Sequence, residues 1–302
     1  MQTPTPGALF RQLLDSDRPV AAPGAFNGLV AREVARAGFR AAYVSGGATS
    51  AAAGVPDVGL LTLDRFAQMV REITQAARTD TGERLPVLAD ADTGFGEEEM
   101  VRRTVIEYAR AGAAGLHIED QVFPKRCGHL DGKALIPTEH MISKVAWAAA
   151  AAKQSCDPDF VVCARTDAAG VEGFEAAVTR AAAYVHAGAP MIFPEGLKSE
   201  DDFARFATDL RARVNSRVYL LANMTEFGKT PLIPLARFGE LGYDIVIYPV
   251  TTLRVALGAV SKALAELKDA GSAEPFLDQM QTRAELYESL GYTPGEPWTH
   301  PV

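Results

Sequence analysis

Short apolar runs alternate with longer segments of helical periodicity along most of the chain. The short runs are rich in Val, Ile, Leu and Tyr, and they lie at residues 19–26, 41–46, 86–94, 115–120, 160–168, 191–195, 218–225 and 243–250. Continuous apolar runs of this length are typical of strands that are buried on both faces of a parallel sheet. Eight such strands separated by helices predict an α/β fold, a closed (β/α)8 TIM barrel.

The segments between the runs have the spacing of amphipathic helices. Acidic residues at 97–99 follow Gly96, where negative charge favours the start of a helix. Helical spacing continues at residues 138–149, 176–187, 201–214, 231–241 and 252–267. Cys156 and Cys163 fall in a helix end and a strand, and we expect both to be small core residues.

Two segments lie outside the eight units. Residues 6–15 predict a short N-terminal helix, and residues 276–290 predict an amphipathic helix that ends at Gly291. The apolar face of the second helix needs a partner, and we favour another subunit over the flank of a barrel already closed by eight helices. We expect one domain over residues 1–302, with the barrel at about 19–270 and a C-terminal helical extension at about 271–302.

Composition excludes several classes of function. The 302 residues include 30 Lys and Arg against 38 Asp and Glu, a net charge of −8. This balance argues against a nucleic-acid-binding protein and against a polybasic membrane-surface protein. The chain has no apolar run of about 18 residues, no apolar signal-peptide core and too few cysteines for a disulfide framework. We therefore expect a cytoplasmic protein that binds neither nucleic acid nor membrane.

Carboxylates gather where the predicted strands end, which is where the reactive groups of a parallel barrel lie. Asp90 and Asp92 are two apart on one predicted strand, so both should point to the same face. Glu119 ends the next strand, and Asp57 lies in the loop after the second strand. Converging carboxylates need a cation between them, and oxygen ligands alone favour Mg²⁺ or Mn²⁺. The alternative is that each acid caps the helix that follows it.

Cys127 lies in a loop bounded by proline and glycine, directly after Lys125 and Arg126. Positive neighbours favour the thiolate, and glycines allow such a loop to close over a ligand. A single Cys with a single His, His129, cannot complete a tetrahedral zinc site. The alternative is a solvent-exposed cysteine without a role.

Other groups at the strand ends suit an anionic ligand. Arg165 and Arg254 can each grip a carboxylate with two hydrogen bonds, or instead form a structural ion pair with a nearby acid. The backbone N–H groups of the turn at 45–47 can meet an anion. Together these groups predict a site for a divalent metal, a ligand with several carboxylates and a thiol that transfers protons. This chemistry suits cleavage of a carbon–carbon bond beside a metal-bound oxygen.

Six motifs make the chain recognisable. They are Ser45-Gly46-Gly47, Pro56-Asp57, Asp90-Ala91-Asp92-Thr93-Gly94-Phe95-Gly96, His117-Ile118-Glu119-Asp120-Gln121, Lys125-Arg126-Cys127-Gly128-His129 and Asn223-Met224-Thr225-Glu226. In this order the chain resembles the isocitrate lyase/phosphoenolpyruvate mutase superfamily over nearly its whole length, and within it the 2-methylisocitrate lyases most closely. The motif around Cys127 is the specific element, because the phosphonomutases of this superfamily lack that cysteine.

The resemblance implies a (β/α)8 barrel whose eighth helix is exchanged between subunits, usually in a homotetramer. It implies Mg²⁺ held directly or through water by four acids, Asp57, Asp90, Asp92 and Glu119. Cys127 matches the residue that protonates the succinate-forming carbanion, and Tyr43 and His129 are the other catalytic candidates. The matching substrate-binding positions are Ser45, Gly46, Gly47, Gly128, Arg165, Glu195, Asn223, Thr225 and Arg254.

The reaction that the resemblance implies is cleavage of 2-methylisocitrate to pyruvate and succinate, in the methylcitrate cycle of propionate catabolism. The chain lacks the insertions of full isocitrate lyases, which favours the methylated substrate. Two alternatives keep the site and change the substrate: cleavage of 2,3-dimethylmalate or a related 2-hydroxy diacid, and hydrolysis of oxaloacetate. Cys127 disfavours a phosphonomutase. A non-enzymatic metal- or carboxylate-binding barrel is the remaining alternative.

Overall fold

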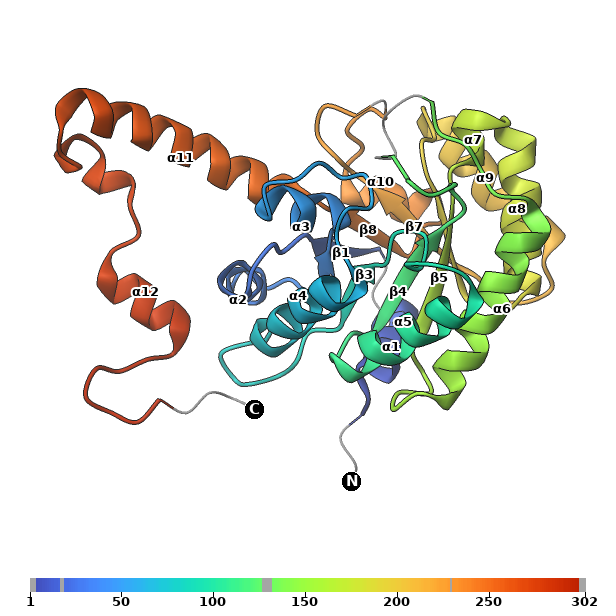
Figure 1. Cartoon of the computed structure of the whole chain (residues 1–302), viewed down its shortest axis with the longest axis horizontal. Helices are drawn as coiled ribbons and strands as arrows, with labels where there is room; N and C mark the ends of the chain where they lie inside the picture. The colour runs from blue at the N-terminus through green and yellow to red at the C-terminus, as the bar shows by residue number, and fades with distance from the viewer. Residues whose placement is uncertain (1–3, 17–18, 127–131, 229, 299–302) are drawn as a thin grey trace.

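Eight parallel strands form the centre of the protein in the computed structural model, which describes residues 4–16, 19–126, 132–228 and 230–298 (Figure 1). The strands are β1 (Val20–Pro23), β2 (Ala42–Val44), β3 (Val87–Asp90), β4 (Gly115–Glu119), β5 (Val161–Thr166), β6 (Met191–Pro194), β7 (Tyr219–Asn223) and β8 (Ile245–Tyr248). From β2 to β8 each strand pairs with the next in sequence, and β8 pairs with β1. A bridge between Gly24 and Tyr43 joins β1 to β2, so the predicted (β/α)8 barrel is confirmed.

Helices follow the strands, and most of them cover the outside of the barrel (Figure 1). They are α1 (Pro6–Ser16), α2 (Gly28–Arg36), α3 (Gly46–Ala52), α4 (Leu63–Ala76), α5 (Glu98–Arg110), α6 (Thr138–Gln154), α7 (Ala168–Val171), α8 (Phe174–His186), α9 (Glu200–Arg213), α10 (Leu235–Glu240), α11 (Thr251–Ala270), η1 (Glu274–Gln279) and α12 (Arg283–Leu290). No helix in the described part of the chain is long and apolar enough to span a bilayer.

Two apolar cores explain why the strand sequences are continuously hydrophobic. One lies between the strands and the surrounding helices, and the other fills the inside of the barrel. Phe10, Leu13 and Leu14 of the predicted N-terminal helix α1 belong to the inner core, so α1 closes one end of the barrel. Of the two cysteines that we expected in the core, Cys163 is buried but Cys156 is exposed, which corrects the second prediction.

The C-terminal part departs from the prediction in two ways. Helix α11 follows β8 but has no buried residue and projects away from the barrel, so the barrel is not closed by its own eighth helix (Figure 1). The helix predicted at 276–290 is interrupted, because η1 ends at Gln279 and α12 begins only at Arg283. Thr282 and Glu285 form a capping box that starts α12 anew, and Gly291 ends it in the left-handed conformation, as predicted.

Candidate active site

The predicted acids converge at the carboxyl end of the barrel, although not for the reason that the sequence suggested. Strand β3 ends at Asp90, and Asp92 lies beyond it in a turn with a positive φ of 47°. The pleat of a strand therefore does not align the two side chains. Instead, the Asp92 backbone N–H donates to Asp90 Oδ1 over 3.0 Å, which folds the turn back over the strand end. A non-glycine residue in the left-handed region is a strain that functional sites often hold.

Lys125 lies in the middle of these acids. Its Nζ bonds to Asp57 Oδ1 and is 2.9 Å from Asp92 Oδ1, and the residue is almost completely buried. Burial lowers the pKa of an ammonium, but Glu119 and the three aspartates outweigh this and raise the pKa of Lys125. The charge of Lys125 is therefore paired with buried carboxylates. It does not support the prediction that Lys125 favours the Cys127 thiolate, which stays a prediction.

The electrostatics of the acids favour a second cation. Burial raises the pKa of Glu119 well above its ordinary value and raises the pKa of Asp92 to about 6, although Lys125 is close. At Asp90, the charges of His117, Lys125 and Arg165 together outweigh the effect of burial and lower the pKa. Glu119 Oε1 is buried and has no hydrogen-bond partner within the described residues. An orphaned carboxylate oxygen beside ionised carboxylates fits an oxygen-ligated divalent metal.

Arg165, at the end of β5, is held by buried acids. Its guanidinium donates to both carboxylate oxygens of Asp167, at 2.9 and 3.1 Å. It also lies 3.3 Å from Glu119 and 3.5 Å from Glu195, whose carboxylate accepts a hydrogen bond from the Asn223 amide over 3.2 Å. The structural ion pair that the sequence left open for Arg165 is therefore present.

The turn at 45–47 is the start of helix α3, which the sequence did not predict. Ser45 is the N-cap residue, and its Oγ accepts from the Ala48 N–H. The Gly46 N–H donates to Asp90 Oδ2 over 3.0 Å, and a Cβ at Gly46 would lie only 2.5 Å from that oxygen. Glycine is thus required there for close packing against the carboxylate, and the Gly46 N–H is not free for an anion. Gly47 and Ser45 line the barrel mouth instead.

His117 in β4 belongs to the site, but sequence reasoning gave it no role. Its Nε2 shares a hydrogen bond of 2.7 Å with the Tyr43 hydroxyl, and its Nδ1 is 3.6 Å from Asp90 Oδ1. Burial lowers the pKa of His117 to about 4, so the ring is neutral near pH 7. The ring also contacts Phe193 edge-on. The signal in the sequence was its position in the same motif as Glu119, two residues before that acid.

A cavity of about 320 Å³ opens at this end of the barrel and brings together most of the predicted residues. Its walls include Tyr43, Ser45, Gly47, Asp57, Asp90, Lys125, Arg165, Phe193, Glu195, Asn223, Thr225 and Arg254. Gly46, Asp92 and Glu119 are behind this lining, in contact with its members. Arg254 stands at the rim, with a side chain 45% exposed and 3.9 Å from Glu226. Cys127, Gly128 and His129 lie outside the described residues.

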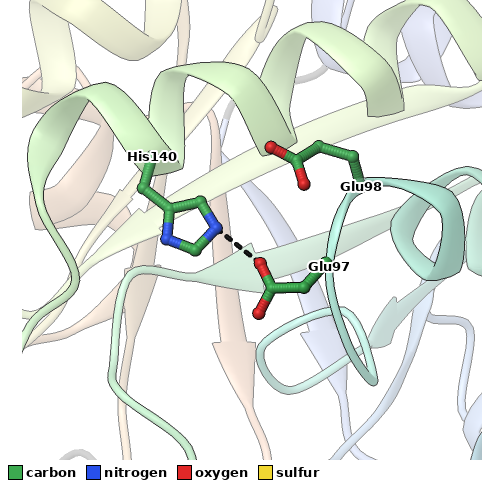
Figure 2. A group of neighbouring side chains, drawn as sticks. All are labelled: Glu97, Glu98 and His140. Carbon is green, nitrogen blue, oxygen red and sulfur yellow. Dashed lines mark hydrogen bonds and ion pairs between the residues drawn. The ribbon is translucent and has the colours of Figure 1, made fainter.

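A different group of potential metal ligands lies away from the mouth. Within the described chain, Glu97, Glu98 and His140 are the group whose ligand atoms all fall within 4.8 Å of one another. Figure 2 shows the His140 ring directed at Glu97, with Nε2 and Oε2 2.6 Å apart. Glu98 accepts a hydrogen bond of 2.7 Å from Ser143. The predicted acids at the barrel mouth are spread more widely, around Lys125.

The chain belongs to the phosphoenolpyruvate phosphomutase family, because the model of that family matches residues 10–268. Its curated relatives include "Probable 2-methylisocitrate lyase 1" of Corynebacterium glutamicum, 51% identical over 94% of this chain and 88% of the relative. The 2-methylisocitrate lyase of Aeropyrum pernix is 48% identical over 95% of this chain and 88% of its own length. The superfamily inferred from the six motifs is confirmed.

Solved structures of similar fold belong to enzymes with several different activities. A 2,3-dimethylmalate lyase matches with a TM-score of 0.86 and 37% identity, over 96% of this chain and 93% of the other. An oxaloacetate acetylhydrolase with the inhibitor 3,3-difluorooxalacetate matches with a TM-score of 0.86 and 33% identity, over 95% and 94%. A phosphonopyruvate hydrolase in complex with oxalate and Mg²⁺ matches with a TM-score of 0.82 and 32% identity, over 95% of each chain.

Proposed function

We propose that this protein is a metal-dependent carbon–carbon lyase that cleaves 2-methylisocitrate to pyruvate and succinate. The single observation that carries the proposal is the arrangement at the barrel mouth, where four acids, a buried lysine and a paired arginine lie in the wall of a small cavity or directly behind it. Curated 2-methylisocitrate lyases of 40 to 51% identity over most of the chain support the choice of substrate. The methylcitrate cycle, and a cytoplasmic location, are part of the same proposal.

Asp57, Asp90, Asp92 and Glu119 would hold the metal, and Mg²⁺ is the proposed ion, with Mn²⁺ as its substitute. The orphaned Glu119 oxygen and the oxygen-only donor set fit a hard divalent cation. When bound, such an ion polarises the oxygens of a 2-oxo or 2-hydroxy acid and stabilises negative charge on them. The related phosphonopyruvate hydrolase in complex with oxalate and Mg²⁺ supports this assignment.

The remaining residues of the mouth bind the substrate and move protons. Arg165 and Arg254 present guanidinium groups to carboxylates, and Glu195, Asn223 and Thr225 line the same wall. The proposed substrate contacts also include Ser45, Gly47 and Gly128, whereas Gly46, whose N–H is bonded to Asp90, packs behind them. Tyr43 lines the same cavity and is oriented by its hydrogen bond with His117, and we assign it a part in proton transfer.

Protonation of the leaving carbanion is assigned to Cys127, with His129 beside it in sequence. The Lys125-to-His129 motif carries this assignment. The described residues on either side of that segment are anchored at the mouth: Lys125 to the metal-site acids, and Lys133 to Asp167 over 2.6 Å. Lys125 lines the cavity, and Asp167 binds Arg165 of the cavity wall, so the described residues on both sides are tied to the mouth.

We propose a homo-oligomer, a tetramer, built through exchange of α11. Its exposed apolar side chains include Val255, Leu257, Val260 and Leu264, 48 to 69% exposed. Such a stripe costs free energy in water and is expected to pack against another copy of the chain. One domain over residues 1–302 remains our prediction. The extension is then the part of that domain that reaches the neighbouring subunit.

A panel of substrates tests the function directly. Purified protein should release pyruvate from 2-methylisocitrate with Mg²⁺, and EDTA should abolish the release. 2,3-Dimethylmalate and oxaloacetate are the competing substrates, because structures with those activities match the whole barrel. Oxalate release without lyase turnover would move the assignment to a hydrolase, and no turnover of any member would remove the proposal.

A further inference from the structure

A second cavity lies beside the barrel mouth and takes no part in the proposed reaction. It has a volume of about 530 Å³ and lies between the loop that precedes α4, the turn that follows β3 and the first turns of α6. Its walls are mainly apolar, with Leu61, Phe95, Met100 and Ile136 among them. Leu60 and Phe123 stand at this cavity 59% and 63% exposed. We call it the side pocket.

Lys144 of α6 lines the side pocket and is the most deeply buried charge among its walls. The residue is only 4% exposed, and its ammonium makes no hydrogen bond or ion pair with any described residue. Burial lowers the pKa of Lys144, and Glu97 and Glu98 offset this only in part. A buried ammonium without a protein partner is costly, and a cavity wall is where a ligand can supply the missing anion.

The acids nearby do not satisfy this lysine. Glu97 is directed to His140 and its side chain is 67% exposed, and Glu98 accepts from Ser143 (Figure 2). The other charged residues at the pocket, Asp64 and Arg103, are exposed. Exposed charges are screened by water, whereas a buried charge keeps its field. Lys144 is therefore the buried charge of the pocket, whereas the other charged groups of its walls are exposed to water.

We propose that the side pocket binds a small aliphatic carboxylate, with the carboxylate on the Lys144 ammonium and the hydrocarbon part against Leu61, Phe95 and Met100. Apolar walls with a single convergent charge are typical of sites for small amphipathic ligands.

The pocket shares a wall with the segment that leads to Cys127. Gln121 lines the pocket, and its amide holds Arg126 through two hydrogen bonds, from its Nε2 to the Arg126 carbonyl at 2.8 Å and from the Arg126 N–H to its Oε1 at 3.0 Å. Thr93 of the pocket directly follows Asp92. A bound carboxylate therefore contacts the residues that fix the mouth without entering it. The site is independent of which substrate the mouth cleaves.

The test uses hexanoate as the probe on the full-length, metal-loaded protein with ¹³C-methyl-labelled methionines. The Met100 methyl group lines the side pocket, so its shift is the readout for binding there. Hexanoate should shift Met100 saturably, with a Kd of about 1 mM as expected for so few atoms. Lys144→Leu should weaken binding at least tenfold, whereas Lys153→Leu, an exposed lysine on the same helix, should not.

Three outcomes of the hexanoate titrations would overturn the proposal. Met100 does not shift at any hexanoate concentration, or its shift persists unchanged in Lys144→Leu, or binding is lost in Arg165→Met and kept in Lys144→Leu. The last result would show that hexanoate binds in the barrel mouth instead of in the side pocket. Uncharged 1-hexanol should bind at least tenfold more weakly than hexanoate, and equal binding would show that the lysine charge is not used. Because none of these readouts is turnover, failure here would leave the proposed lyase activity untouched.

Discussion

Two buried lysines in neighbouring cavities have pKa values that are shifted in opposite directions. Lys125 in the mouth is surrounded by Asp57, Asp92 and Glu119, and its pKa is raised. Lys144 in the side pocket has no direct partner among the described residues, and its pKa is lowered. Burial acts in the same direction on both, so the difference comes from the acids alone. The mouth is organised to hold cations, and the side pocket is organised to receive an anion.

Replacing each lysine by methionine tests this difference, and the larger effect on stability is expected at Lys125. We expect Lys125→Met to lower the free energy of unfolding by about 3–5 kcal/mol, because it leaves several buried carboxylates without their cation. Urea unfolding of the metal-free protein at pH 8 measures this loss. Added Mg²⁺ should restore part of it by mass action. A variant as stable as the parent would show that the acids do not depend on Lys125.

A second experiment tests whether the mouth also orients its tyrosine. His117→Phe removes the hydrogen bond to Tyr43 but keeps a ring against Phe193, and it should lower kcat about 100-fold with little change in KM. His117→Gln can place an amide near the Nε2 position and should recover about tenfold of the loss. Steady-state kinetics of both variants measure the split. Equal losses in Phe and Gln, or a loss only in KM, would contradict an orienting role.

The sequence predicted the barrel and the position of the acids because both depend on local pattern. Continuous apolar runs specify buried parallel strands, and residues such as Asp90 and Glu119 follow from where those strands end. The pairing of Lys125 depends on how a loop returns across the barrel, so no spacing in the sequence encodes it. His117 was missed because a single histidine in an apolar run is most simply a core residue.

In the C-terminal extension, too, the sequence pattern predicted the helix but not its packing. Periodicity showed that residues 252–267 form an amphipathic helix, but it could not show that α11 leaves the barrel, because nothing local records what covers the apolar face. The break before α12 was readable. Thr282 followed three residues later by Glu285 is the sequence of a capping box, and it marks a new helix start.

The pH dependence of metal binding tests whether Asp92 is a ligand of the metal in the mouth. Burial raises the pKa of Asp92 to about 6, so below pH 6 a metal must displace a proton from that carboxylate. The affinity for Mn²⁺ should therefore rise more steeply with pH below about pH 6, where the metal must displace a proton from Asp92 as well as from Glu119, than above it. Isothermal titration between pH 5 and 8 measures the curve. Asp92→Asn should remove the bend near pH 6, and a parent protein with the same affinity throughout would contradict the assignment.

The smallest expected effect belongs to the other lysine and has the opposite sign. Lys144→Met removes a buried ammonium that has no hydrogen bond to the described residues, while the methionine side chain fills nearly the same volume. The free energy of unfolding should stay the same or rise by about 1 kcal/mol, with Lys153→Met as the exposed control on the same helix. Urea unfolding at pH 7 without added carboxylate measures it. A loss above about 1 kcal/mol would mean that the protein itself satisfies Lys144, and the contrast with Lys125 would then be one of degree.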